Sequence, residues 1–316
     1  MGDIVKQIKG QPALRESFMS LARRIFDLDF KLWYEAGFWS DKYIPYSIVE
    51  DGAVVANASV NLMDFVHLGS QRRYIQIGTV MTDGEYRGRG FARRLLTEII
   101  ADWKDRCDGI YLFANSTVLD FYPKFGFVRV CEHEYAFEVS ETGPEGVSLG
   151  KAADKSGKWE LEKLNMDSNE GRALLYRCYE KGNPFSQMWM KDNQGLLMFY
   201  CHSFLKDCVY YAPAAGLVVV AQQDGNEWIV YDIFGEMKES VVPEKEGVST
   251  LRSFLSRLCQ DFGSGKTRKI RLGFTPLDKE CFVRRSAGGD DTLFVLAQKE
   301  NPFGASQGMF PLLSHA

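Results

Sequence analysis

The sequence predicts a mixed α/β protein that is divided into two domains. Three observations lead to this class: the length of 316 residues, the succession of strand-like and helix-like hydrophobic patterns, and a polar break near the middle. A chain of this length exceeds the usual size of one hydrophobic core. Residues 140–157, SETGPEGVSLGKAADKSG, are polar, glycine-rich and without hydrophobic period. We therefore expect a linker there, between a first domain of residues 1–139 and a second of residues 158–316.

The first half contains a helix, three strands, a helix, a strand, a short helix and a strand. Apolar residues three or four positions apart predict a helix from about residue 14 to 33 and another over residues 90–104. The strand-like runs are residues 44–49, 53–63, 73–81, 109–114 and 135–139, and the turn Glu-Asp-Gly joins the first two in a hairpin. A short helix is expected over residues 118–125, where Gly126 stops it.

The second half repeats much of this order. Helices are expected at residues 168–180, 193–205 and 249–262, and strands at 209–211, 217–222, 228–235, 268–274 and 292–298. The two halves share almost no sequence identity, so the pattern predicts a structural duplication rather than a recent repeat.

The composition excludes several classes of protein. A hydrophobic fraction of 45% and a charged fraction of 25% are typical of globular domains, and a net charge of −4 argues against a broad nucleic-acid-binding surface. The seven cysteines form no C-x-x-C pair and the four histidines have no metal-ligand spacing, so we expect reduced thiols and no metal site. No signal-peptide core and no run of 18 apolar residues is present, which predicts a cytoplasmic protein that neither crosses nor binds a membrane.

Residues 85–96, EYRGRGFARRLL, place Gly88 and Gly90 among arginines, directly before the second long helix. Free N–H groups at a helix start attract anions, and glycine lets the backbone approach a phosphate closely. Neighbouring arginines can add charge-assisted hydrogen bonds. Two interpretations remain open from this stretch alone: a pyrophosphate-binding loop, or a solvated turn before a helix with a charged surface.

Three motifs resemble the GNAT family of N-acetyltransferases. The pattern R-x-x-G-x-A at residues 87–92 is similar to the family's pyrophosphate loop, and FYPKFGF at residues 121–127 is similar to its tyrosine helix. PYSIVEDGAVVANASV at residues 45–60 resembles its central hairpin. The resemblance covers about residues 13–139. It implies a GNAT acyl-CoA N-acyltransferase fold whose fourth and fifth strands diverge, in a tandem arrangement with a degenerate second GNAT-like domain.

The resemblance also implies acetyl-CoA as cosubstrate and a set of residues that bind it. The pantetheine arm would pair with the backbone of a strand, and the pyrophosphate would lie on the amides of the glycine loop. These residues are Val80, Met81 and Thr82 on the strand, and Arg87, Gly88, Arg89, Gly90, Phe91, Ala92 and Arg93 in the loop. Asn115 would contact the pantetheine or only cap the next helix. Lys124 would reach the cofactor phosphates or only solvent.

Catalytic roles follow from the resemblance only in part. Tyr122 matches the family's tyrosine beside the CoA sulfur and would protonate the departing thiolate, unless it only packs against its aromatic neighbours. The family often places a carboxylate on the fourth strand as general base, but YIQIGTVM has none. Asp64, Glu85, His133 and Glu134, or a chain of waters to a carboxylate, are the alternatives.

The predicted function is transfer of an acetyl group from acetyl-CoA to a primary amine of a small molecule, an amino acid or a peptide, by direct attack. The alternatives are a CoA-binding regulatory module without turnover and a transferase of a larger acyl or aminoacyl group. The acceptor amine is expected near five aromatic residues, Trp33, Phe38, Trp39, Tyr43 and Tyr46. Glu35 and Asp41 would attract a cationic amine or are simply solvated.

The second domain is expected to have lost its cofactor site. The stretch that would hold the pyrophosphate, MKESVVPEKEG at residues 237–247, is acidic and contains a proline. Its expected tasks are to cover the acceptor cleft or to form homodimer contacts. Pro184, Phe185, Trp189 and Met190 form an apolar cluster that would serve either task, or would belong to the core.

Overall fold

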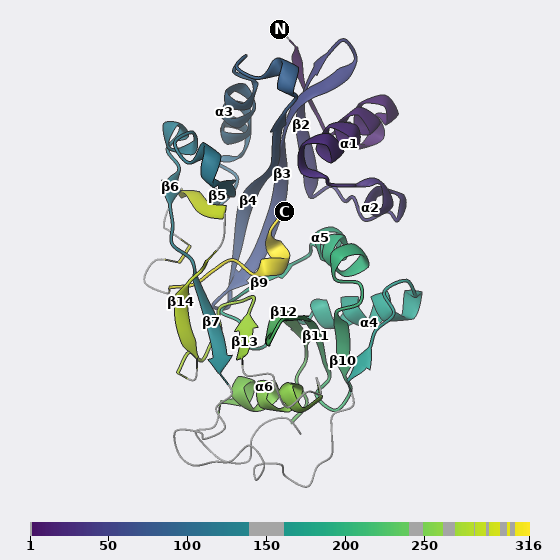
Figure 1. Cartoon of the computed structure of the whole chain (residues 1–316), viewed down its shortest axis with the longest axis vertical. Coiled ribbons are helices and arrows are strands. Elements are labelled where there is room, and N and C mark those ends of the chain that lie inside the picture. Colours follow the sequence, from purple (N-terminus) through teal and green to yellow (C-terminus); the bar gives the residue numbers. More distant parts are fainter. Residues whose placement is uncertain are drawn as a thin grey trace.

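The computed structural model describes residues 2–138, 161–239, 249–261, 269–280, 282–288, 291–297, 302–303 and 307–316. Two mixed β-sheets lie one above the other, and helices cover their outer faces (Figure 1). The expected linker of residues 140–157 lies outside the described residues, as does most of the stretch 237–247. No helix in the described ranges is long and apolar enough to cross a membrane.

The first sheet has the strand order β1-β2-β3-β4-β5-β15-β6, and β9 pairs with β3 beside this path. Its strands are β1 (Asp3–Lys6), β2 (Tyr43–Glu50), β3 (Ala53–His67), β4 (Ser70–Thr82), β5 (Gly109–Asn115), β6 (Val128–Arg129), β9 (Met188–Lys191) and β15 (Asp291–Ala297). Among the described strands of this sheet, only β4 and β5 pair in parallel. The crossover between these two strands passes through a helix, as parallel neighbours require.

Helices α3 (Phe91–Trp103) and α1 (Pro12–Phe26) cover opposite faces of this sheet (Figure 1). In α3, the fully buried Leu95, Leu96 and Ile99 share one face and pack on the strands. Each such side chain contributes about 1.5–3 kcal/mol of hydrophobic stabilisation. On the other face, α1 and the short α2 (Lys31–Glu35) enclose an aromatic core. A 3-10 turn, η1 (Ile8–Gly10), precedes α1.

The short helix predicted over residues 118–125 is instead two separate 3-10 turns, η3 (Ser116–Val118) and η4 (Tyr122–Phe125). The side chain of Asn115 caps the first by accepting from the N–H of Thr117. Pro123 lacks an N–H group, which limits any longer helix through this segment. Gly126 ends the second turn with a φ of 90°, as the sequence indicates.

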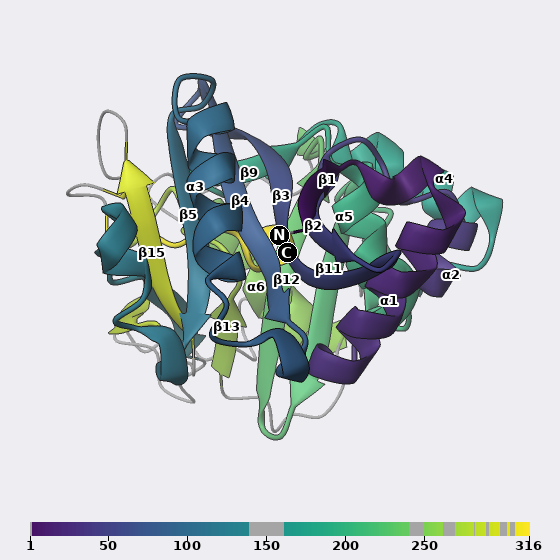
Figure 2. The same cartoon turned by 90° about the horizontal axis from the view of Figure 1, so that it is seen from above.

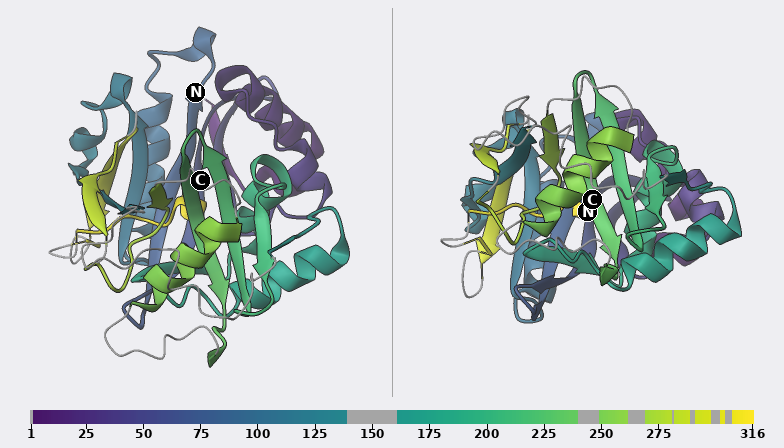
Figure 3. Two further views of the ribbon diagram at one scale, coloured as in Figure 1. Left: turned by 60° about the horizontal axis from the view of Figure 1, so that its bottom comes forward. Right: turned by 90° about the horizontal axis from the view of Figure 1, so that it is seen from below.

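The second sheet has the order β14-β7-β13-β12-β11-β10-β8. Its strands are β7 (His133–Glu138), β8 (Glu162–Lys163), β10 (Val209–Ala212), β11 (Leu217–Asp224), β12 (Glu227–Gly235), β13 (Lys269–Leu272) and β14 (Val283–Ser286). Helix α6 (Thr250–Asp261) crosses its outer face (Figure 3). Helix α4 (Asn169–Tyr179) lies at one side of the second sheet. The helix expected over residues 193–205 begins as α5 (Gln194–Phe199) and continues as a π-helical turn, η5 (Tyr200–Phe204).

The two sheets repeat one arrangement. In each, three antiparallel strands are followed by a crossover helix and a parallel strand: β2-β3-β4-α3-β5 in the first and β10-β11-β12-α6-β13 in the second. The next strand in each sheet comes from the other half of the chain. β15 pairs antiparallel with β5 (Figure 2), and β7 pairs antiparallel with β13 (Figure 1). β7, which precedes residues 140–157, thus belongs to the second sheet, and β15, which follows them, belongs to the first sheet.

A single hydrophobic core joins the inner faces of the two sheets. It includes Phe65 and Tyr111 from the first sheet and Val218 and Phe234 from the second. Residues 309–316, which we call the 309–316 segment, lie in this core and contain the 3-10 turn η7 (Leu312–Ser314). The ring of Phe310 stacks on Tyr111 at a centroid distance of 3.9 Å.

Candidate active site

Strands β4 and β5 diverge in the middle of the first sheet. They pair through three residue pairs, which end at Gln76 and Tyr111, and then separate. Beyond that pair, β4 contains a bulge opposite Ala58, where Thr79 adopts a φ of 50°. Such a backbone is uncommon for a β-branched residue and is often found at functional sites. We call the divergence between residues 77–82 and 112–115 the first split.

The second sheet has a corresponding divergence, which the chain itself fills. Strands β12 and β13 pair only as far as Val230 and Leu272. Residues 182–187 then lie between them: the carbonyl of Gly182 accepts from the N–H of Gly235 at 3.0 Å, and the N–H of Gln187 donates to Thr275 at 2.8 Å. In the described ranges, no third segment forms backbone hydrogen bonds across the first split in this way.

The glycine loop lies at the start of α3, after the 3-10 turn η2 (Gly84–Tyr86). Gly88 and Gly90 have φ values of 77° and 78°, and an added Cβ at either would meet open space. Gly90 is the N-cap of α3 and offers no side chain to its first amides. Within the part of the chain that the structure describes, the N–H groups of residues 88–93 have no hydrogen-bond acceptor. These amides and the helix dipole are available to an anion.

The arginines of the loop surround these amides with positive charge. Arg87, Arg89 and Arg93 are exposed. Arg89 lies over the ring of Tyr86 at 4.6 Å and reaches Glu50 only at 3.7 Å. Neither Arg87 nor Arg93 forms an ion pair with a described residue. Exposed pairs of this kind are weak, so the guanidinium groups remain free to contact phosphates.

Tyr122 lies on the α3 side of the first sheet. It is 5% exposed, and its ring packs against Phe121, Phe127 and Phe294 at centroid distances of 5.3–6.2 Å. No described residue forms a hydrogen bond with its hydroxyl group. Burial without a compensating partner raises the pKa of Tyr122 to about 12. The phenol is therefore protonated at neutral pH and can act as a proton donor.

The other residues predicted to bind the cofactor lie at the same edge. Val80 and Thr82 are half-buried on β4, whereas Met81 points into the core beneath α1. Phe91 is buried beneath α3, and Ala92 is half-buried beside it. Asn115 ends β5 and caps η3, and Lys124 is exposed in η4. Figure 1 shows β4, β5 and the start of α3 gathered at this end of the sheet.

Comparison with known proteins identifies this arrangement. Residues 13–127 match the sequence model described as the acetyltransferase (GNAT) family. The chain carries a GNAT domain. No curated protein matches the sequence, so the remaining comparisons are structural.

The fold of several solved structures extends over nearly the whole chain. A protein of unknown function from Enterococcus faecalis V583, described as a probable N-acyltransferase, has a TM-score of 0.58 at 12% identity, with 96% of this chain and 74% of that chain covered. Eis1 from Mycobacterium abscessus has a TM-score of 0.54 at 14% identity, covering 94% and 74%. A GCN5-related N-acetyltransferase from Kribbella flavida has a TM-score of 0.53 at 15% identity, covering 94% and 72%. Identities this low establish likeness of fold only.

The face of the GNAT domain opposite α3 carries a buried row of polar side chains. Tyr43 contacts Ser59 and Thr79 at 3.0 Å each, and Asn57 donates to Ser59 at 2.9 Å. Ser47 continues the row by donating to Asn57. These residues hold the bulge of β4 in place, because Asn57 also donates to the carbonyl of Thr79 at 3.1 Å.

The 309–316 segment lies on the same face, against the start of the first split. Gln76 binds the backbone of Ala316 twice, accepting from its N–H and donating to its carbonyl, each at 3.0 Å. A Cβ added at Gly78 would lie 2.5 Å from the Ala316 carbonyl oxygen, so the two segments are in close contact. His315 stacks on Phe113 of β5 at 4.0 Å. The sequence gives no signal for these contacts, because LLSHA has no motif or period.

The four residues considered as general base lie in different places. Asp64 forms ion pairs with Lys42 and Arg73, both at 2.7 Å, and these cations hold its pKa below the usual value despite burial. Its partner on β4, Arg73, lies five residues from Gly78, or roughly 17 Å along the strand. Glu85 is exposed in η2. His133 and Glu134 belong to β7 of the second sheet.

The aromatic residues expected near the acceptor do not all share one face. Trp33, Trp39 and Tyr43 form part of the buried core beneath α1, and Phe38 packs at its edge. Tyr46 lies on the opposite face, where it donates to Asp102 of α3 at 2.7 Å. This difference follows from strand alternation, because Tyr46 lies three positions after Tyr43 in β2 and successive side chains alternate between faces. Glu35 lies near Lys31 at 3.8 Å, and Asp41 is 97% exposed.

The apolar cluster predicted around residue 185 is divided between the two sheets. Phe185 belongs to the core beneath α6, whereas Met190 lies in the core between the sheets. Trp189 is on β9, which pairs with β3 of the first sheet. Pro184 is half-buried in the segment that fills the second divergence. The cluster therefore connects the two sheets, which agrees with the interpretation that it belongs to the core.

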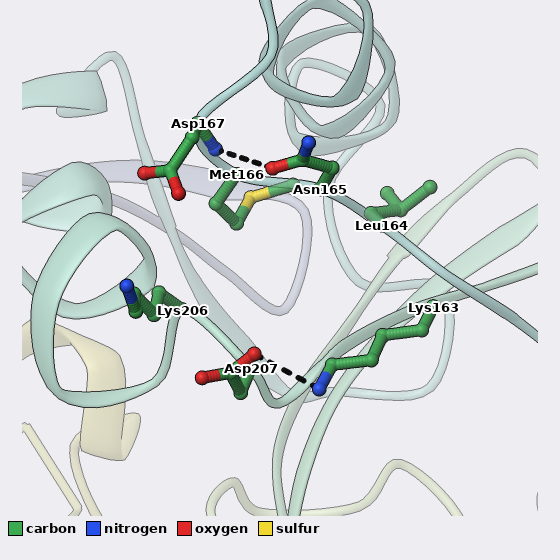
Figure 4. A pocket seen from close by; sticks show the side chains of 7 residues that line it. All are labelled: Lys163, Leu164, Asn165, Met166, Asp167, Lys206 and Asp207. Carbon is green, nitrogen blue, oxygen red and sulfur yellow. Dashed lines mark hydrogen bonds and ion pairs between the residues drawn. The ribbon is translucent and has the colours of Figure 1, made fainter.

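Two surface hollows lie away from the glycine loop. One, of about 280 Å³, is lined by residues 163–167 together with Lys206 and Asp207, and the Lys163–Asp207 ion pair of 2.9 Å spans it (Figure 4). The other, of about 500 Å³, lies near the β3–β4 turn and mixes acidic and basic side chains such as Asp64 and Arg72. Neither contains a residue predicted to bind CoA.

Proposed function

We propose that the protein transfers an acetyl group from acetyl-CoA to a primary amine of a small molecule, an amino acid or a peptide. The observation that carries the proposal is the coincidence of two features at one edge of the GNAT domain. The unpaired amides of the glycine loop and the divergence of β4 from β5 lie together. The glycine loop offers an anion site, and the divergence of the two strands offers unpaired strand backbone.

The residues present fit CoA in both places. The pyrophosphate would lie on the amides of residues 88–93, where glycines leave open space, and Arg87 and Arg93 would contact it. The pantetheine arm would pair with the backbone of residues 80–82 as an added strand would. Filling of the second divergence by residues 182–187 supports this assignment, since such a gap there holds a third segment of backbone.

The reaction requires two proton transfers. The amine nitrogen attacks the thioester carbonyl carbon, the C–N bond forms, and the C–S bond breaks. Tyr122 donates its hydroxyl proton to the departing sulfur, because its raised pKa keeps the phenol protonated at neutral pH. The attacking nitrogen loses one proton as the amide forms.

Calorimetric titration of the purified protein with acetyl-CoA tests the proposal. Binding near one site per chain is expected for the wild type, and Gly90→Glu is expected to abolish it. A glutamate there places a carboxylate where the pyrophosphate should bind, and it strains a backbone with a φ of 78°. Gly69→Glu is the matched control, because Gly69 has a φ of 79°, the same open surroundings and a place in the β3–β4 turn.

Both glycines have a left-handed φ and open surroundings, so the two variants are distinguished by the position of the new charge. Loss of binding in Gly90→Glu but not in Gly69→Glu supports the loop as the pyrophosphate site. Equal affinity in both variants would remove that assignment. Thiol release with a panel of amines then separates an enzyme from a protein that binds CoA without turnover.

A further inference from the structure

Each sheet has a β-bulge on the strand that separates from its parallel neighbour. In the first sheet, β4 has one residue more than β3 between Gly78 and Met81, shortly after its last pair with β5 at Gln76. In the second sheet, β12 has one extra residue, Tyr231, directly after its last pair with β13 at Val230. A bulge bends its strand and increases the local twist. Its recurrence at the same place in both sheets links the bulge to the divergence that follows it.

The bulge of β4 contains a strained residue. Thr79 has a φ of 50°, which lies in the left-handed region. For a β-branched residue, this conformation costs a free energy comparable to that of about one or two hydrogen bonds. Strained residues persist only where the surrounding structure holds them in place. The conformation of β4 beside the first split therefore depends on the groups that contact Thr79.

Side chains of β2 and β3 hold Thr79 at its backbone and at its side chain. Asn57 donates to the carbonyl oxygen of Thr79 at 3.1 Å, and the hydroxyl group of Tyr43 lies 3.0 Å from its Oγ1. Ser59 donates to the Tyr43 hydroxyl group, which leaves the proton of that group for Thr79. Ser47 donates to Oδ1 of Asn57, so the amide nitrogen is turned toward Thr79. Asn57, Ser47 and Ser59 are fully buried, and the loss of a hydrogen bond there is costly.

We propose that Asn57 and Tyr43 are positioning residues for acetyl-CoA: by holding the bulge at Thr79, they keep β4 apart from β5 and so set the affinity of the first split for the cosubstrate. This inference rests on the proposed function, in which the pantetheine arm pairs with the backbone of residues 80–82. Those residues directly follow Thr79 in the chain. A change of the bulge therefore turns the N–H and C=O groups that the pantetheine arm would meet.

A substitution at position 79 separates this role from general destabilisation. Without the hydrogen bond from Asn57, Thr79 can relax to an extended φ, and the bend of β4 is reduced. Glycine adopts a left-handed φ without a steric penalty, because it has no Cβ. Thr79→Gly should therefore preserve the bulge even where a holding side chain is missing. It cannot replace hydrogen bonds or packing lost elsewhere in the core.

The test measures acetyl-CoA affinity by calorimetry in Asn57→Ala and in Tyr43→Phe, each alone and combined with Thr79→Gly. Tyr43→Phe keeps the ring in the aromatic core and removes only the hydroxyl group, so it carries the test if Asn57→Ala does not fold. Asn61→Ala is the matched control. Asn61 is also buried on β3 and donates to a β4 carbonyl, that of Gln76, at 3.3 Å, where the strand has no bulge. Each titration is made below the melting transition of the variant.

The single variants should bind acetyl-CoA more weakly, by about tenfold for Asn57→Ala and about threefold to tenfold for Tyr43→Phe. Adding Thr79→Gly should restore both affinities to within about threefold of wild type, and Asn61→Ala should stay within about twofold. Unchanged affinity in both single variants, no recovery with Thr79→Gly, or an equal loss in Asn61→Ala would overturn the inference while the proposed function stands. If the wild type does not bind acetyl-CoA, the proposed function and this inference fail together.

Discussion

The buried carboxyl group of Asp232 predicts how the free energy of unfolding changes with pH. This carboxyl group lies on β12 and is 2% exposed. It accepts hydrogen bonds from the side chain of Asn183 at 2.6 Å and from the N–H of Ile233 at 2.9 Å, and no described cation pairs with it. Burial raises its pKa from 3.8 to about 7, against the opposing effect of those two bonds. The perturbation is Asp232→Asn, which keeps an acceptor oxygen and removes the ionisable group.

The direction in which stability changes with pH follows from proton linkage. Because the pKa is higher in the folded state, the folded protein binds the proton more tightly than the unfolded chain does. That stabilisation is complete below the unfolded pKa, near pH 4, and is lost as pH rises through about 7. A shift of roughly three units, at 1.36 kcal/mol per unit, corresponds to at most about 4 kcal/mol. Relaxation and water penetration reduce this penalty in real proteins, so about 2–4 kcal/mol is expected.

Denaturant unfolding at pH 5, 6, 7 and 8 provides the measurement. The free energy of unfolding of Asp232→Asn, relative to wild type, should increase by about 1–2.5 kcal/mol between pH 5 and pH 8, because only about two units lie between pH 5 and the folded pKa of about 7. Asp224→Asn, at the exposed end of the neighbouring β11, is the control for the same substitution outside the core. A constant difference for Asp232→Asn across this range would show that the buried carboxyl group does not resist ionisation, and would refute the reasoning.

Two further predictions concern the first split and the exchanged strands. Tyr122→Phe should lower kcat about 10²–10⁴-fold while acetyl-CoA affinity, measured by calorimetry, changes less than twofold; full activity would remove its role as the acid. Residues 1–139 produced alone lack β15, which covers β5, and should not show a cooperative thermal transition. Producing residues 1–139 together with residues 140–316 should restore the cooperative thermal transition. A cooperative transition of residues 1–139 alone would show that the fold does not depend on the exchanged strands.

The sequence predicts the elements that local pattern determines. The apolar residues of α3 recur at helical spacing, and the helix covers residues 91–103 where the pattern indicated 90–104. The positive φ values of Gly88 and Gly90 agree with the reason for expecting glycine in that loop. Both features depend only on neighbours in the sequence. Hydrophobic period and turn chemistry are therefore enough to find them.

The sequence does not indicate which strands pair when they lie far apart in the chain. Residues 135–139 and 292–298 were both recognisable as strands, and β7 and β15 lie there. Alternation does not indicate which sheet a strand joins, since a strand buried on both faces suits either one. In β15, Phe294 faces the α3 core, whereas Leu293 and Val295 face the core between the sheets. Its sequence is thus compatible with a central place in either sheet.

The contacts of the 309–316 segment beside the first split escaped sequence analysis for the same reason. The loop and Tyr122 belong to compact motifs, but His315 reaches Phe113 across about two hundred residues of chain. No local pattern around residue 315 distinguishes it from any other histidine. Only the three-dimensional arrangement shows that its ring stacks on Phe113 and that its carbonyl accepts from Tyr200.

The exchange of strands and the filling of the second divergence have a joint consequence for the first split. Residues 182–187 close the gap in the second sheet and continue directly into β9, which pairs with β3 of the first sheet. β15 then ties the second half of the chain to β5, one of the two strands that border the first split. The 309–316 segment follows β15 and packs between the sheets that these connections hold together. The second half thereby closes its own gap, and it places the 309–316 segment beside the start of the first split.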